Sequence, residues 1–248
     1  MTNKESSKNS SGLPTGALLI TIISFIVFSL GFLPVIIFGK ITLMVISFQE
    51  LWHFFLLPFL ICIGIVIIIV YQLLFSGLII HLFNIKYKPG VYEYTYKDKM
   101  SFKWILICSL YTPWRKILGS FLFGEMKYVY YRFLGMKIGK NTLVGGTVMD
   151  PCLTEFGDNC TMGLYAVIYG HIHDYEKGTI MMDRIKIGNN VVIGAGVLIM
   201  PGAVVQDNVK IAAGAVVTKG QVLKKNSIYA GIPAKELKIK KKKRDFKL

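Results

Sequence analysis

Acidic residues are scarce in this sequence. The 248 residues contain 14 Asp and Glu against 29 Lys and Arg, a formal net charge of +15. This excess predicts either a solvated basic face or an anionic partner, such as lipid head groups or a phosphorylated cofactor. The four cysteines (Cys62, Cys108, Cys152, Cys160) show no metal-ligand spacing, which argues against a cysteine-based metal site and indicates reduced, buried thiols.

Charge is absent from two long stretches of the first half. No charged residue occurs between Lys8 and Lys40, and no Lys, Arg, Asp or Glu occurs from Leu51 to Ile85. Within these stretches, Gly16–Phe38 and Phe55–Ile80 are apolar and long enough to cross a bilayer. We therefore expect a membrane domain over residues 13–85, after a disordered N-terminus over residues 1–12. The alternative is a buried helical hairpin of a soluble protein, but both runs are apolar all round rather than on one face.

Loop charge predicts the orientation of these spans. Ten Lys and Arg against three acids lie between Lys86 and Lys137, whereas the loop between the spans carries one Lys and one Glu. The positive-inside rule places the segment after the second span, and everything that follows, in the cytoplasm of a multi-pass membrane protein. Residues 86–136 mix aromatic and basic side chains and predict an interfacial linker with one or two helices on the bilayer. Nucleic acid would suit the same composition, but the neighbouring spans explain it already.

A six-residue period organises the second half. From Ile138 the sequence reads IGKNTL VGGTVM DPCLTE FGDNCT MGLYAV IYGHIH, and after an interruption it resumes as IGNNVV IGAGVL IMPGAV VQDNVK IAAGAV. The first position of each hexad is aliphatic or aromatic except at Asp150, and the fifth is mostly small or β-branched. Such a period predicts short strands joined by tight corners and stacked into coils, with Gly and Asn at the corners. The repeat domain is expected over residues 137–234, followed by a basic tail over residues 235–248.

The period is interrupted once, at Asp174–Lys186, where an insertion must leave the coil as a loop. His171 and His173, the only histidines of the repeat half, lie at the edge of this insertion, and the frame puts Ile172 between them in an inward position. Two imidazoles beside the only insertion form a candidate site, although a pair of surface histidines is the plainer interpretation. We expect Asp174 or Glu176 to orient an imidazole, as the third member of triad-like sites does.

The hexads resemble those of the hexapeptide-repeat acyltransferases. That resemblance implies an all-β left-handed parallel β-helix of about five coils, here preceded by an α-helical membrane domain with two transmembrane helices. It also implies a homotrimer with sites at the subunit boundaries, and acetyl-CoA or another acyl-CoA as donor rather than as a bound cofactor.

Two resemblances differ over the catalytic base. IYGHIHD is similar to the site segment of galactoside, maltose and virginiamycin-type acetyltransferases, which implies His173 as general base. The order of spans, Trp-containing linker and GHIHDYEKGTIMMDRIKIG resembles the terminal module of polylysine-synthase-type peptide synthetases, which points to His171. Their adenylation and carrier domains have no counterpart in this sequence. We prefer His173 and keep both.

The donor-binding residues are implied by the same family likeness. YAGIPAKELK resembles the close of the repeat near bound coenzyme A, with Ile232 in place of the usual Asn. Small corner residues would leave room for a pantetheine arm, although they also suit corner packing alone. The residues expected to contact the donor are Gly194, Gly196, Ala213, Gly214, Lys219, Gly231, Pro233, Ala234 and Lys235.

These observations predict a membrane-anchored acyltransferase acting on the hydroxyl or amine of a cell-envelope or small-molecule acceptor. No side chain of the repeat is an obvious nucleophile, so direct transfer with a histidine base is favoured. Two alternatives remain open: a non-catalytic scaffold of a membrane complex, and an aminoacyl-transferring or peptide-bond-forming module. A zinc enzyme of the γ-carbonic-anhydrase type is disfavoured, because its site needs three protein ligands and the repeat offers two histidines. No metal and no nucleic acid are expected as partners.

Overall fold

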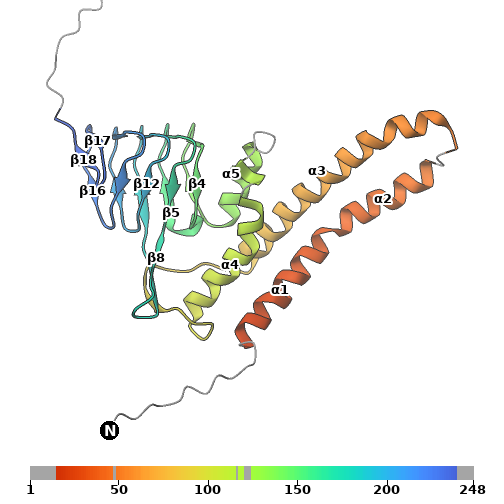
Figure 1. The fold of residues 1–248 in the computed structure, drawn as a ribbon, viewed down its shortest axis with the longest axis horizontal. Coiled ribbons are helices and arrows are strands. Elements are labelled where there is room, and N and C mark those ends of the chain that lie inside the picture. Colours follow the sequence, from red (N-terminus) through yellow and green to blue (C-terminus); the bar gives the residue numbers. More distant parts are fainter. Residues whose placement is uncertain (1–14, 47–48, 116, 120–123, 239–248) are drawn as a thin grey trace, which may run out of the picture.

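A computed structural model describes residues 15–46, 49–115, 117–119 and 124–238 of the chain. It has two regions: a group of helices built from the first half, and a stack of short strands built from the second (Figure 1). The expected disordered N-terminus and most of the basic tail lie outside the described residues.

The first three helices form a long antiparallel pair. The first limb consists of α1 (Thr15–Gly31) and α2 (Leu33–Val45), and the second is the single helix α3 (Leu51–Leu82) (Figure 1). The predicted span Gly16–Phe38 is therefore divided between two helices, because Pro34 lacks an amide hydrogen and Phe32 N donates to Ser29 O instead of Phe28 O. The freed Phe28 carbonyl accepts the side chain of Gln72 at 2.6 Å.

The surface of this pair is apolar far along its length. Thr15–Val45 and Leu51–Leu82 are both long and apolar enough to cross a membrane, with 17% and 0% of their most apolar windows buried. Side chains such as Phe25, Ile36 and Phe59 are more than 60% exposed. Cys62 is exposed on α3, so the expectation of a buried thiol fails there, whereas Cys160 is buried inside the coils.

The segment between the long helices and the strands packs inward. It contains β1 (Gly90–Glu93), α4 (Lys99–Arg115), the short helix η1 (Ile117–Gly119) and α5 (Gly124–Phe133). Its aromatic side chains Trp104, Tyr111, Tyr130 and Tyr131 are buried rather than arranged along an outer surface. Ser109 of α4 hydrogen-bonds to Ser24 of α1 at 2.9 Å, and Tyr130 of α5 to Ser76 of α3 at 3.2 Å.

The repeat folds as a parallel β-helix with three faces. Strands that are one coil apart pair in parallel at a spacing of 18 residues, as Lys186 does with Val204 and Val204 with Val222. Each of the three faces is one sheet. Face 1 holds β2 (Lys137–Ile138), β5 (Thr154–Phe156), β10 (Ile185–Ile187), β13 (Val204–Val205) and β16 (Val222–Leu223). Face 2 holds β3 (Leu143–Val144), β6 (Thr161–Met162), β11 (Val192–Ile193), β14 (Lys210–Ile211), β17 (Ile228–Ala230) and the antiparallel β18 (Lys235–Glu236). Face 3 holds β4 (Thr147–Val148), β7 (Val167–Ile168), β12 (Leu198–Ile199) and β15 (Val216–Val217).

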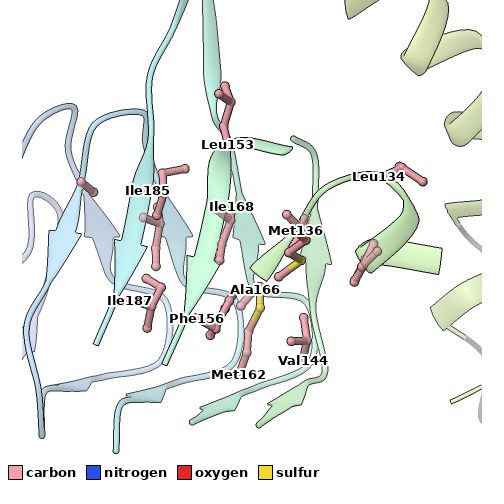
Figure 2. Close-up of a cluster of buried hydrophobic side chains, with 14 of the residues drawn as sticks. Leu134, Met136, Val144, Leu153, Phe156, Met162, Ala166, Ile168, Ile185 and Ile187 are labelled. Atoms are coloured by element: carbon pink, nitrogen blue, oxygen red, sulfur yellow. The ribbon is translucent and has the colours of Figure 1, made fainter. Parts of the chain in front are cut away.

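The inward positions of the hexads form the interior of these coils. Figure 2 shows first-position side chains such as Val144, Phe156, Met162, Ile168 and Ile187 inside the stack, with Leu134 and Met136 at the end that adjoins α5. All of these are at most 4% exposed. Burying such a column is the main favourable contribution to folding, at about 1.5–3 kcal/mol for each large aliphatic side chain.

Asparagines at positive φ form the corner between face 1 and face 2. Asn141, Asn159, Asn190, Asn208 and Asn226 have φ between 52° and 60°, a conformation that Asn tolerates better than most residues. Their side-chain amides are joined from coil to coil, for example Asn190 to Asn208 at 3.2 Å and Asn208 to Asn226 at 2.9 Å. The corner therefore repeats this hydrogen bond at three steps of the stack, the third being between Asn141 and Asn159.

The hexad frame is wrong around Asp150. On face 3 it is Val148 that pairs with Ile168 and points inward, at a spacing of 20 residues rather than 18. The corner before β4 is two residues shorter than in later coils, and the corner after it is two residues longer. Asp150 therefore lies beyond the strand, at the start of the short helix η3 (Pro151–Leu153), in the corner between face 3 and face 1.

The interruption of the period is a β-hairpin at the same corner, one coil further along. β8 (His171–Asp174) and β9 (Thr179–Met182) pair antiparallel, and β1 adds a third strand to β9 (Figure 1). The hairpin starts three residues before the predicted insertion, so Ile172 lies in it, half-buried and opposite Met181, and not in the core. Strand pairing between β5 and β10 is then 31 residues apart, as between Glu155 and Lys186.

Candidate functional site

A buried carboxylate lies at the base of the hairpin. The Asp150 side chain is fully buried and hydrogen-bonds to four groups. Its Oδ1 accepts from Tyr87 Oη at 2.7 Å and from Trp104 Nε1 at 3.1 Å, and its Oδ2 accepts from Gly170 N at 2.7 Å. The fourth group is His171, whose Nδ1 is 2.7 Å from Oδ2. Charge buried in this way is stabilised only when its hydrogen bonds are complete, as they are here.

This contact determines which nitrogen of His171 is free. When Asp150 is ionised and His171 is neutral, Nδ1 donates to the carboxylate and Nε2 is left as an acceptor. The His171 side chain is 10% exposed, which leaves it accessible from one side. Asp150 was not among the predicted site residues, although it is the one polar residue in the aliphatic position of the hexads.

His173 lies beside His171 but has different surroundings. The two imidazole centroids are 5.4 Å apart, and the His173 ring is stacked on Tyr175 at 5.5 Å. Its Nδ1 is buried and has no hydrogen-bond partner among the residues that the structure describes. Burial, with a smaller contribution from His171, lowers the pKa of His173, so this imidazole is neutral at physiological pH.

Aromatic side chains from the helical region line the same place. The Trp104 ring is 4.7 Å from the ring of His171 and 5.2 Å from that of His173, and Tyr94 is 4.6 Å from His173. Trp104 belongs to α4 and Tyr94 follows β1, so the candidate site lies between the repeat and the segment that precedes it. Rings of this kind restrict access by water and give an acceptor flat apolar surfaces to pack on.

The acids of the hairpin turn face elsewhere. Asp174 Oδ1 accepts from Lys177 N at 3.1 Å, and Asp174 Oδ2 is 3.4 Å from Lys177 Nζ. These contacts lower the pKa of Asp174, the backbone hydrogen bond contributing most. Glu176 lies in the same exposed turn. The carboxylate against His171 is therefore Asp150, and the orienting contact expected from Asp174 or Glu176 is not the one that the structure describes.

The residues expected to bind the donor fall at two corners. Gly194, Gly196, Ala213, Gly214, Gly231 and Pro233 stack at the corner between face 2 and face 3, and Ala234 and Lys235 follow them. Lys219 lies instead at the corner between face 3 and face 1, two coils beyond the hairpin. Gly196 and Gly214 have φ of 68° and 69°, a conformation that glycine adopts readily, so the turn alone favours glycine at both positions. Within one chain, most of this set is at a different corner from the histidines.

A basic hollow on face 1 was not foreseen from the sequence. It measures about 690 Å³ and is lined by Lys137, Lys186 and Lys225 together with Glu155 and Asp207. Lys137 is paired with Glu155 at 2.9 Å. Lys137, Glu155 and Lys186 come from outward positions of successive face-1 strands, and Asp207 and Lys225 come from the corners that follow β13 and β16. No cluster of three or more His, Cys, Asp and Glu suited to a metal ion occurs among the described residues.

Comparisons with known proteins agree on the repeat. Residues 184–219 match the family described as bacterial transferase hexapeptide (six repeats). A Bacillus subtilis (strain 168) protein named "Putative acetyltransferase YvoF" is 35% identical over 86 residues, which is 32% of this chain and 47% of that protein. The chain thus spans about half the length of the curated relative that it matches.

Two solved acetyltransferase structures are more distantly similar to this chain. A maltose O-acetyltransferase from Clostridium difficile 630 is 28% identical over 46% of this chain and 74% of its own, with a TM-score of 0.38. A galactoside acetyltransferase in complex with coenzyme A is 24% identical over 46% and 70%, with a TM-score of 0.37. The predicted hexapeptide repeat, with its parallel strands and two apolar N-terminal helices, is confirmed, as is the likeness to acetyltransferases.

Proposed function

We propose that this protein is a membrane-anchored acyltransferase that moves an acyl group from an acyl-CoA thioester to a hydroxyl or amine. The observation that carries the proposal is the pair of His171 and Asp150, at 2.7 Å, at the base of a hairpin that leaves a transferase-type hexapeptide repeat. The proposal includes a left-handed β-helix and cytoplasmic placement of the repeat, as the family likeness and the loop charges imply.

In this mechanism His171 Nε2 removes the proton from the acceptor as the acceptor attacks the thioester carbon. Asp150 holds the imidazole in the required tautomer and stabilises the cation that forms, as the acid of a catalytic triad does. The proton then passes from His171 to the departing thiolate of coenzyme A. We assign the role of base to His171, whereas the sequence resemblance had favoured His173. The contact with Asp150 supports His171, and the unpartnered Nδ1 of His173 fits a residue that lines the acceptor site.

Donor binding is proposed to involve two surfaces. The lysines of the face-1 hollow suit the phosphates of an acyl-CoA, because ammonium groups bind phosphate as point charges. The stacked small residues between face 2 and face 3 suit an extended pantetheine arm. Since this corner is not the one that carries the histidines, a site that uses both would need a second copy of the chain, which supports the homotrimer as a proposal.

Membrane anchoring is supported by the exposed apolar surface of α1, α2 and α3. A buried core helix would pass the same length and composition test, but these helices are largely unburied in the chain. Anionic lipid head groups suit the basic segment around Lys86–Lys103, and the acceptor class follows from neither feature.

The test is thiol release from acetyl-CoA by the purified full chain in nanodiscs, with a panel of sugar and amine acceptors from cell-envelope precursors. We expect His171→Ala to lower the rate by about 10²–10⁴-fold and to remove the ascending limb of the pH–rate profile. His173→Ala should keep that limb. Loss of the limb in His173→Ala alone would transfer the role to His173. Full rate in both variants would remove the base role from both histidines, whereas no thiol release by the unsubstituted chain would favour the scaffold over the enzyme.

A further inference from the structure

The carboxylate of Asp150 is held from two directions. Gly170 N and His171 Nδ1 belong to the repeat and contact Oδ2. Tyr87 Oη and Trp104 Nε1 contact Oδ1, and both come from the segment that joins α3 to the repeat. Half of the hydrogen bonds to this carboxylate therefore come from outside the β-helix.

We propose that Tyr87 and Trp104 are positioning residues for His171, acting through Asp150, so that the helical region supplies part of the site. The inference rests on the proposed role of His171, and it adds a partner to that site from the other region of the same chain. Neither residue needs to touch the acceptor or the donor for this role.

The geometry gives the physical reason. Two donors on Oδ1 fix the plane of the carboxylate, and a fixed plane aims Oδ2 at His171 and not at solvent. The Trp104 ring also packs edge-on against both imidazoles, so α4 limits their rotation. Both donors are buried, Tyr87 at 3% and Trp104 at 8% exposed, so water cannot replace a donor that is removed without a rearrangement.

The pKa values of the neighbouring groups also support this positioning role. Burial, followed by the charge of Asp150, raises the pKa of Tyr87 well above its usual value, so this hydroxyl keeps its proton and remains a donor. Among the described residues, the titratable groups around the cluster include Cys108, Cys152, Tyr94, Tyr169 and His173, with Arg115 beyond Cys108. Burial raises the pKa of the Cys108 and Cys152 thiols to about 12, so they stay neutral. Stabilisation of the carboxylate charge thus depends on its hydrogen-bond donors.

The test compares hydroxyl deletions that differ only in what the hydroxyl contacts. Tyr87→Phe removes a donor to Asp150, whereas Tyr111→Phe removes an equally buried hydroxyl that donates to Val148 O at 2.7 Å and does not contact Asp150. Trp104→Phe is the second variant. Losing a donor leaves more negative charge on Asp150, which favours the protonated imidazole of His171.

We expect Tyr87→Phe and Trp104→Phe each to lower kcat by about 10-fold, the effect of one hydrogen bond to a charged group, with little change in KM. The ascending limb of the pH–rate profile should move to higher pH in both. The double variant should lose less than the product of the two, because both act on one carboxylate. Tyr111→Phe should reduce thermal stability and leave the limb where it is.

A second readout does not depend on turnover. Titration of His171 by NMR, in full chain with labelled histidine in nanodiscs, should show its midpoint displaced upward in Tyr87→Phe and unchanged in Tyr111→Phe. If the unsubstituted chain releases no thiol from acetyl-CoA, the proposed function fails while this titration still tests the coupling. Equal midpoints in Tyr87→Phe, Trp104→Phe and Tyr111→Phe would overturn the inference even in an active enzyme.

Discussion

The two regions of this chain differ in how their contacts repeat along the sequence. In the repeat, each coil buries the same kinds of side chain at the same positions, and residues 18 apart are paired from coil to coil. In the described part of the helical region, the contacts are individual ones such as Gln72 with Phe28 O. A periodic region is defined by one local rule, so its interior follows from the sequence. The candidate site lies at the interruption of the period, where residues of the helical region contact the repeat.

The largest expected effect comes from giving Asp150 the residue that the hexads predict. Asp150→Val would conform to the sequence pattern, but it would leave Tyr87, Trp104, Gly170 and His171 without their acceptor. We expect a loss of about 10²–10⁴-fold in acyl-transfer rate and at least about 3 kcal/mol in the free energy of unfolding, because several buried donors lose their partner together.

Val148→Ala is the matched control, since Val148 occupies the inward position that the pattern assigned to Asp150. It should cost stability through its cavity and keep the rate per folded molecule. Acyl transfer and unfolding would be measured on the same preparations. A fully active Asp150→Val would show that the period, and not the buried carboxylate, is what the site requires.

The second prediction compares the same substitution, Ile to Ala, in the two regions. Ile199 inside the coils is 0% exposed and Ile36 on α2 is 62% exposed. Ile199→Ala should lower the free energy of unfolding by about 2–5 kcal/mol, whereas Ile36→Ala should change it by less than about 0.5 kcal/mol. Denaturant unfolding in one detergent measures both. Similar losses at the two sites would mean that the helical surface is covered by protein and not by lipid.

The smallest effect concerns the place where α5 closes the first coil. Lys127 of α5 is nearly buried and donates to Val144 O at 2.7 Å and Gly146 O at 3.0 Å. Burial lowers the pKa of Lys127 to about 8. Because the unfolded chain binds this proton more tightly, the folded state gains stability as pH rises from about 8 towards the unfolded value of about 10.5.

The measurement is the difference in unfolding free energy between the unsubstituted chain and Lys127→Met. It should move in favour of the unsubstituted chain by about 1 kcal/mol across that window, after allowance for solvent screening, and stay constant below pH 8. Lys210→Met, on the exposed side of β14, is the control and should show no such trend. A difference that is independent of pH would mean that water reaches the Lys127 ammonium.

The repeat could be predicted because one rule is sampled many times. The inward positions of Ile168, Ile187 and Ile199 follow from that rule, as do the Gly and Asn corners. The site could be predicted only in part. His171 and His173 stood out beside the interruption, and Asp150 broke the hexad pattern, but the pattern does not show where the two-residue shift places its side chain. The contacts of Tyr87 and Trp104 join residues more than 40 positions apart, and no local pattern encodes such a pairing.

The regular coils also divide the length of the repeat into equal steps. Paired strands lie about 4.8 Å apart, so each 18-residue coil advances the stack by that distance. Gly202 and Gly220 mark successive steps beyond the hairpin, and Gly220 N donates to Pro201 O across one of them. Removing residues 203–220 would bring everything after them one step closer to His171 without changing any corner. Length along this axis therefore changes in whole coils, whatever the number of residues that a corner or a hairpin adds to one of them.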